Sequence, residues 1–433
     1  MKYPLFVVLG LAATPLYAGT GSSASGTNFT SGPSGNHTAL FSADHNPAMN
    51  NFMVREEETY RFNFGPAFSY GIELGDVGNF ADDLDDLIDI IDDPDSTDES
   101  PSDVLERFNS VLENMGEHGY IKNTINVRAP VLPLFYKSDR FGGTFSVDFS
   151  LDATIGARVL DDELKYDQDK DYLTNTAIYL KSGIEKRLSF GYGRELWSYN
   201  DMGKLYGGAR LDISNMELSK QVMPLQMLDG RDISDVMTDE YDKNLVSTTA
   251  MSVDIGVVWD ADFYRLGLTL ADINSPSFDY GAVGVNCDER EPGSTEQSAC
   301  YATEYFIEVK GDLKAYETHT KHARATVDGA LHIGNKWWLT SALDLAAYDD
   351  PVGFENQWFH LAASYETGGF WLPSLRSGYQ VNLTGSETSS LNVGATFFKM
   401  LNFDIEYGLE SVEVDGSTGP RRLGFALSLT EHF

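Results

Sequence analysis

The C-terminal third of the chain alternates apolar and polar residues in seven successive stretches, and this alternation limits the fold more than any other feature. In the last stretch, residues 423–433, the alternate positions are Leu423, Phe425, Leu427 and Leu429, and Phe433 stands at the very end. A period of two is typical of a β-strand with one apolar face and one polar face. A tilted strand of roughly 9–11 residues also crosses a bilayer. Taken alone, the stretch fits the last strand of a soluble sandwich equally well.

The six preceding stretches favour a barrel over a sandwich. Their polar members include charged and amide residues such as Asp328, Arg376 and Asp404, which a sandwich would have to bury in an apolar core. In a membrane barrel the apolar face meets lipid and the polar face lines the lumen, and short turns at one end alternate with longer loops at the other. The six stretches are residues 323–333, 337–346, 357–365, 374–383, 390–397 and 401–409.

Earlier parts of the chain carry weaker strand patterns. Together with the C-terminal stretches they predict an all-β fold, a single antiparallel transmembrane β-barrel of about 14–16 strands. A mean hydropathy of -0.27 argues against a bundle of apolar membrane helices but is compatible with a barrel, whose lumen and loops are polar. The earlier predicted strands are residues 59–70, 131–137, 142–155, 174–183, 187–197, 204–214, 248–258, 262–271 and 303–317.

The first residues have the composition of a secretory signal peptide. Lys2 supplies a positive charge, Leu5 to Ala13 form an apolar run too short to span a bilayer, and small residues follow Ala18. We therefore expect residues 1–18 to be removed after Ala18 and the remaining chain to be exported.

One acidic segment departs from the β pattern and predicts a helical insertion at about residues 78–117. Its first apolar stripe repeats at helical spacing, and a second run from Val104 to Met115 does the same. Ser100 or Ser102 would cap the second helix and Gly116 would end it. The insertion is either a lid that packs its stripe on the barrel or an element that gates the barrel or docks a partner. The first stripe consists of Leu84, Leu87, Ile88 and Ile91.

Charge and cysteine content exclude some functions. A formal net charge of -35 makes nucleic acid an improbable partner, because phosphate binding needs clustered Lys and Arg. The two cysteines, Cys287 and Cys300, flank a short Gly- and Pro-containing loop, which in an exported protein predicts a structural disulfide.

The sequence carries no motif for a cofactor, a metal or a catalytic site. Asp167, Asp169 and Asp171 begin like a Ca²⁺ loop, but Tyr172 and Ile178 stand where the loop requires Gly and Glu, so only a loosely bound surface cation stays open. No G-x-S-x-G or H-E-x-x-H is present. We expect no enzyme, although a hidden hydrolase site stays open.

The histidines of the barrel region do not change this expectation. His319 and His322 fall in a predicted turn, where a chance pair is commoner than a metal site. His332 and His360 have lumen-facing parity, and they could meet across strands or stand there simply as polar lumen residues.

The chain end resembles the C-terminal signal of outer-membrane proteins from Gram-negative bacteria. Phe433, Leu429, Leu427 and Phe425 match that signal, whereas Glu431 departs from it. The resemblance implies an outer-membrane location, contact with outer-membrane lipid and lipopolysaccharide, and the barrel-assembly machinery as a partner during biogenesis.

A second resemblance lies near the start of the exported chain. Asn46-Pro47-Ala48 is similar to the N-P-A of FadL-type barrels, which pass hydrophobic molecules across the outer membrane. In that family the segment belongs to a plug inside the barrel. The resemblance implies an N-terminal plug at residues 19–55 with these three residues at the gate, and a barrel at residues 56–433.

Over nearly its full length the chain resembles the barrel-type family of conjugal transfer protein TraF, distinct from the thioredoxin-like TraF, since it has no C-x-x-C. The resemblance rests on the N-P-A region, the acidic insertion and residues 132–150, 267–280 and 393–410. Together with the FadL-type resemblance, it leads us to expect a passive channel or binder for small hydrophobic or amphipathic solutes, captured in an apolar pocket. The alternative is a non-transporting docking component of an envelope or plasmid-transfer apparatus that acts through the helical insertion.

Overall fold

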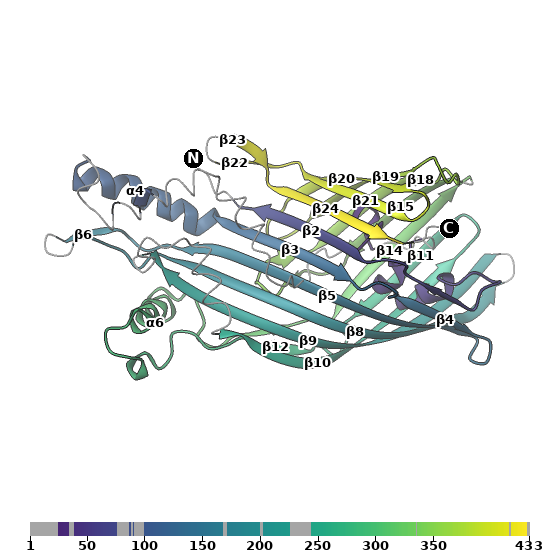
Figure 1. Ribbon diagram of the computed structural model, residues 1–433, viewed down its shortest axis with the longest axis horizontal. Helices are drawn as coiled ribbons and strands as arrows, with labels where there is room; N and C mark the ends of the chain where they lie inside the picture. Colours follow the sequence, from purple (N-terminus) through teal and green to yellow (C-terminus); the bar gives the residue numbers. More distant parts are fainter. Residues whose placement is uncertain are drawn as a thin grey trace.

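Fourteen antiparallel strands close into a barrel in the part of the chain that the computed structural model describes (Figure 1). This confirms the predicted fold class and the lower end of the predicted strand number. The described residues are 25–33, 39–75, 86–87, 90, 99–167, 171–199, 202–225, 244–334, 336–414 and 417–430. The predicted signal peptide, residues 1–18, therefore lies outside them.

The barrel wall closes because β5 pairs with β8 at one side and with β3 at the other. Two short strands, β1 (Tyr60–Phe62) and β4 (Leu134–Ser138), pair with each other and add to β5 beyond the end of β3. In ring order the strands are β5 (Gly143–Leu160), β3 (Tyr120–Arg128), β2 (Ala67–Leu74), β24 (Arg422–Leu429), β21 (Leu401–Gly408), β20 (Ser389–Phe397), β19 (Ser374–Asn382), β18 (Trp358–Tyr365), β15 (Trp337–Asp344), β14 (Arg324–Ile333), β11 (Tyr264–Ala271), β10 (Val246–Asp260), β9 (Gly203–Pro224) and β8 (Ala177–Tyr199).

The two ends of the barrel differ in their connections. At one end, called the short-turn end, β8–β9, β10–β11, β14–β15 and β20–β21 are joined by short turns, and β24 ends there. At the other, called the long-loop end, β2–β3 and β11–β14 are joined by segments of several tens of residues. Strands β5, β8 and β9 are much longer than those of the C-terminal half and extend toward the long-loop end (Figure 1).

The alternation of the C-terminal strands has the predicted orientation. In β24, Phe425 and Leu427 are exposed on the outer surface, whereas Arg422, Ala426 and Ser428 are buried inside. The pattern repeats in the neighbouring strand β21, and an apolar belt therefore surrounds a polar lumen. Phe433 lies outside the described residues, and Leu429 shares the outward parity of β24.

Four predicted strands are wrong. Residues 59–70 contain two separate strands, β1 and the start of β2, which pair with different neighbours. The predicted strands 174–183 and 187–197 are one strand, β8, because Glu185 continues the inward parity and pairs with Lys321 instead of forming a turn. Residues 303–317 are not a strand: helix α6 (Thr295–Tyr305) runs into π-helix η8 (Phe306–Lys310). The helix begins at Ser294, whose hydroxyl accepts a hydrogen bond from the Gln297 N–H at 3.1 Å, an N-cap that outweighs the short alternation after it.

The remaining elements are small. Helix α4 (Pro101–His118) lies at the long-loop end, and short hairpins extend from several loops (Figure 1). No helix within the described ranges is both long and apolar enough to span a membrane. The small elements are β6 (Lys165–Asp167) with β7 (Asp171–Leu173), β12 (Ser277–Asp279) with β13 (Thr318–Thr320), β16 (Tyr348–Asp349) with β17 (Glu355–Asn356), β22 (Ser411–Val414) with β23 (Ser417–Pro420), and η7 (Cys287–Glu289).

Residues 25–33 and 39–55, called the inner segment, lie within the lumen. They form α1 (Asn28–Ser31), α2 (Ser42–His45) and η2 (Pro47–Phe52). Helix η2 contacts β8, β9 and β10, whereas α1 contacts β18 to β21 on the other side of the ring. The inner segment therefore crosses the lumen from one part of the wall to another.

Candidate functional site

Asn46-Pro47-Ala48 forms the start of helix η2 in the inner segment. The Asn46 side chain accepts a hydrogen bond from the Ala48 N–H at 3.0 Å, and Pro47 takes the first helical position, where no N–H is required. The Asn46 amide also donates to the carbonyl oxygens of Val257 at 3.3 Å and Leu268 at 3.5 Å. One side chain thus caps the helix and fixes it to strands β10 and β11.

A row of three glycines in the wall makes room for this turn. Gly193, Gly208 and Gly256 are directly paired across β8, β9 and β10. A Cβ atom on Gly208 would overlap the backbone of Pro47, and one on Gly256 would overlap the Asn46 side chain. The missing side chains therefore let the Asn46-Pro47 backbone lie directly on the wall.

Asp44, in helix α2, is the electrostatic anchor of the inner segment. Its carboxylate pairs with Arg128 of β3, with Arg187 of β8 at 3.5 Å and with Arg210 of β9 at 3.2 Å. Burial alone would raise the pKa of Asp44, but the three guanidinium groups outweigh burial and hold that pKa well below its ordinary value. Asp44 is therefore ionised and joins three strands.

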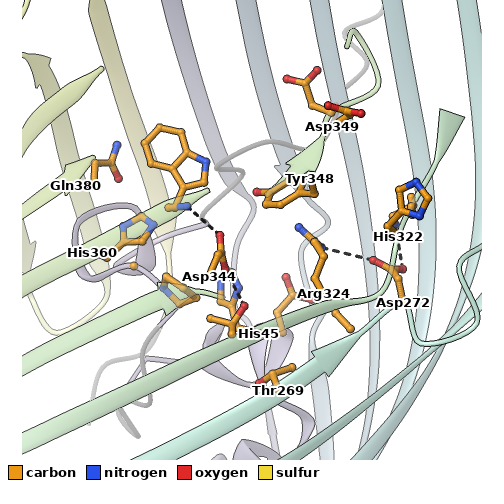
Figure 2. Close-up of a pocket in the computed structure, with 18 of the residues that line it drawn as sticks. His45, Thr269, Asp272, His322, Arg324, Asp344, Tyr348, Asp349, His360 and Gln380 are labelled. Carbon is orange, nitrogen blue, oxygen red and sulfur yellow. Dashed lines mark hydrogen bonds and ion pairs between the residues drawn. The ribbon is translucent and has the colours of Figure 1, made fainter. Parts of the chain in front are cut away.

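A cavity of about 170 Å³ adjoins the inner segment inside the barrel (Figure 2). Its walls come from the inner segment, from barrel strands and from the loops of the long-loop end. Six carboxylates, four basic side chains and four histidines line it, together with Phe29, Tyr348 and Trp358. The expected apolar pocket is thus wrong for this cavity, whose lining is charged and aromatic.

The four histidines of the lining are His45, His319, His322 and His360. Burial lowers the pKa of His45, in the inner segment, to about 4, and lowers the pKa of His319, in the β12–β13 hairpin, to about 4. His332 does not join them, because its ring stacks on Trp338 with the centroids 4.3 Å apart. Within the described residues, no group of three or more His, Cys, Asp or Glu side chains is arranged to hold a metal ion.

The helical insertion packs on the barrel. The apolar stripe of α4 is buried against outward residues of β5, β8 and β9, and Leu87 joins the same cluster. The stripe consists of Val104, Phe108, Leu112 and Met115. Leu84, Ile88 and Ile91 lie outside the described residues. Ser100 caps α4, but the helix passes Gly116 and ends before Gly119, whose N–H donates to the Met115 carbonyl, so the predicted stop is wrong.

Two other predicted features lie away from the cavity. Cys287 and Cys300 form a disulfide that joins η7 to α6. Asp167 and Asp171 pair across the β6–β7 hairpin, whereas Asp169 lies outside the described residues.

Sequence reasoning missed the arginines that pair with Asp44 and the glycine row under Pro47. Each arginine has inward parity on a strand, which the alternation alone indicates. Which of them meet Asp44 depends on barrel closure, because Arg128 and Arg210 lie 84 and 166 residues from it along the chain.

The chain matches one protein family and resembles several solved structures. The family described as "F plasmid transfer operon, TraF, protein" matches residues 44–344. No curated protein matches the chain. The toluene transporter TodX of Pseudomonas putida is similar in structure at 12% identity, with a TM-score of 0.44, and 97% of this chain and 100% of that chain are covered. A Pseudomonas aeruginosa FadL homologue gives 12% identity, a TM-score of 0.38, and coverage of 96% and 98%.

Proposed function

The chain belongs to the TraF family of the F plasmid transfer operon, and from that premise we propose that this member is an outer-membrane barrel that binds small amphipathic solutes in its lumen and releases them past the inner segment. The observation that carries the proposal is the position of the cavity. It lies inside a closed barrel and is bounded on one side by Asp44 and His45 of the inner segment.

The outer surface supports a membrane location. The outward side chains of β20, β21 and β24 include Val393, Ile405 and Phe425, all exposed in the isolated chain. Large apolar side chains exposed in a continuous belt are unfavourable in water and suit lipid. Aromatic residues at the short-turn end, among them Trp337 and Trp371, have the chemistry of an interfacial girdle.

The lining of the cavity favours amphipathic over purely hydrophobic solutes. A hydrocarbon would leave the charged groups of the lining desolvated without a new partner, which is unfavourable. A solute with a polar end and an apolar body can meet both kinds of wall, since Phe29 and Trp358 stand among the charged residues.

The inner segment has the contacts expected of a gate. Met49 and Met53 of the inner segment pack in an apolar cluster with Phe135 and Val258 of the wall. Its polar contacts, an ion cluster at Asp44 and hydrogen bonds at Asn46, can separate without breaking the wall. On the glycine row the wall has no side chains, so the Pro47 backbone and the Asn46 and Asn51 side chains lie directly on it. We infer that release of these contacts opens a path toward the short-turn end.

Binding to the full chain in phosphatidylcholine nanodiscs tests this function. Octylammonium, octanol and octanoate are titrated separately, with empty nanodiscs and an unrelated barrel as references. Saturable binding of at least one of the three, absent from both references, is the expected result. Binding no stronger than to empty nanodiscs for all three would overturn the proposal.

A further inference from the structure

We propose that the cavity selects amphipathic solutes whose polar end is a cation, and that the Asp344 carboxylate receives this cation. The inference rests on the proposed function, because it names the chemical class of solute for the same cavity. It runs against the assumption that a buried cavity rich in arginine would bind a carboxylate.

The basic side chains of the lining are already engaged. Each forms an ion pair at 2.9–3.5 Å: Arg187 and Arg210 with Asp44, Lys321 with Glu185, and Arg324 with Asp272. An anionic solute would have to replace one of these carboxylates, and a buried carboxylate left without its partner is strongly unfavourable. Each basic side chain of the lining thus has a carboxylate partner. The Arg187 Nε–H has no hydrogen bond, but it is buried and the guanidinium interacts with the carboxylates of Asp44, Glu185 and Asp212.

Asp344, at the end of β15, is in the opposite situation. Its carboxylate accepts hydrogen bonds from the Thr326 hydroxyl at 2.8 Å and from the backbone N–H of Trp358 at 3.2 Å. Neither donor is charged, and Asp344 has no ion pair with any described residue. Figure 2 shows Asp344 among the labelled side chains of the cavity. An added cation would give it a charged partner without displacing one.

Arg324 weakens this argument, because its positive charge interacts electrostatically with the Asp344 carboxylate. Its guanidinium, however, makes its direct contacts with other side chains. It lies 4.4 Å from the ring centroid of Tyr348 and pairs with Asp272 at 3.5 Å. It therefore stands beside the proposed site without neutralising it through a direct contact.

Two buried imidazoles supply an independent observation that points to a ligand. His360 and His319 line the cavity at 9% and 8% exposure, and neither ring has a hydrogen bond to another described residue. A neutral imidazole carries one lone pair that accepts a hydrogen bond. His360 also interacts electrostatically with Asp344, so the two acceptors act on the same space. An ammonium group bound at Asp344 would have further N–H donors for the His360 ring.

The apolar end of the solute also has a place in the cavity. Phe29 of helix α1 and Pro33 line the wall formed by the inner segment. Phe29 is 7% exposed and therefore offers only a small apolar surface, on which the end of such a chain would leave water. The cation would thus face the β15–β18 wall while the apolar chain covers the inner segment.

Isothermal titration calorimetry on the nanodisc-bound full chain tests the head-group preference. Octylammonium, octanol and octanoate share one chain length and differ only in the head group. We expect octylammonium to bind at least tenfold more tightly than octanoate. In Asp344→Asn its affinity should fall by at least tenfold, whereas Asp344→Glu, which keeps the charge, should retain most of it. Asp262 is an exposed turn residue at the short-turn end. Asp262→Asn removes the same charge as Asp344→Asn, and as a control it should change the octylammonium affinity less than twofold.

The outcomes separate this inference from the proposed function. Tighter binding of octanoate or octanol than of octylammonium would overturn the cation preference and leave the proposed function standing. An unchanged octylammonium affinity in a folded Asp344→Asn variant would overturn the role of Asp344. Absence of binding for all three compounds would overturn the proposed function itself. If Asp344→Asn does not fold, the head-group series on the wild type still decides the preference.

Discussion

The carboxylate of Asp44 lies 3.2 Å from the guanidinium of Arg210, although 166 residues separate the two in the chain. The same carboxylate also pairs with Arg128 and Arg187. The Asp44–Arg210 pair can form only after β9 has joined the wall and the inner segment has entered the lumen. The position of the inner segment is therefore a consequence of barrel closure and not of local sequence.

Replacement of Asp44 by Asn should loosen the inner segment. Breaking a buried ion pair by removing one partner destabilises by about 3–5 kcal/mol, because the remaining charges stay buried without a counter-charge. We expect faster hydrogen exchange in peptides from residues 39–55 while the barrel strands keep their protection. Asp262→Asn removes an exposed carboxylate and serves as the control. Equal exchange in both variants would contradict the anchoring role of Asp44.

Replacement of Gly208 by Ala should displace the Asn46-Pro47-Ala48 turn. The added Cβ would overlap backbone atoms of Pro47, which cannot rotate away as a side chain can. Cross-linking or exchange measurements should report an exposed turn. Gly329→Ala is the matched control, because a Cβ in that strand position meets its nearest atom at 3.4 Å, an ordinary contact. A native-like inner segment in Gly208→Ala would be incompatible with the close approach described above.

The β12–β13 hairpin should loosen as the pH falls from 6.5 toward 4. Burial and Lys321 lower the pKa of His319 to about 4, against the partial opposition of Asp350 and Glu185. Because the folded-state pKa lies below the unfolded value of 6.5, the unfolded hairpin binds more protons in this window. The hairpin therefore loses stability on acidification below pH 6.5. The loss is about 3 kcal/mol for the difference between the unfolded and folded pKa of His319.

Hydrogen exchange of peptides spanning residues 277–281 and 318–322, measured at pH 7.5 and 4.5 and corrected for the intrinsic rate, checks this expectation. In His319→Gln the exchange rates of these peptides at the two pH values should differ less than in the wild type. A wild-type hairpin equally protected at both pH values would show that His319 does not titrate in this way.

Phe108→Ala should detach helix α4 and leave the barrel folded. Phe108 is fully buried between α4 and the outer face of β5, β8 and β9, and truncation of a buried Phe destabilises by about 3–5 kcal/mol. Proteolysis within residues 99–118 measures the release. The exposed neighbour Glu106, replaced by Ala, should leave the helix in place. Loss of the whole barrel in Phe108→Ala would mean that α4 is part of the core fold.

The alternation of the C-terminal strands was sufficient to predict the barrel and the orientation of its faces, because a lipid-facing side and a polar lumen leave opposite signals on successive residues. Strand β3 was missed for a local reason. Asn123 occupies an outward position, where it accepts a hydrogen bond from the Tyr70 hydroxyl at 2.7 Å. One polar residue on the apolar face was enough to hide the period.

The cavity could not be predicted in the same way. Its lining combines the inner segment, barrel strands and the loops after β11 and β15, and the meeting of these parts is a property of the closed ring. Asn46-Pro47-Ala48 was recognised by resemblance, but the glycine row beneath it is spread over β8, β9 and β10. No local sequence signal links Gly208 to Pro47.

Planar-bilayer conductance of the full chain tests the central claim, that the inner segment closes the lumen until its anchor is released. The measurement compares the wild type with Asp44→Asn, and Asp262→Asn controls for the change in charge. The account predicts a wild type that is mostly closed, an Asp44→Asn variant with frequent openings, and a control that behaves like the wild type. Identical conductance in the wild type and Asp44→Asn, with the inner segment shown by exchange to be released in the variant, would contradict it.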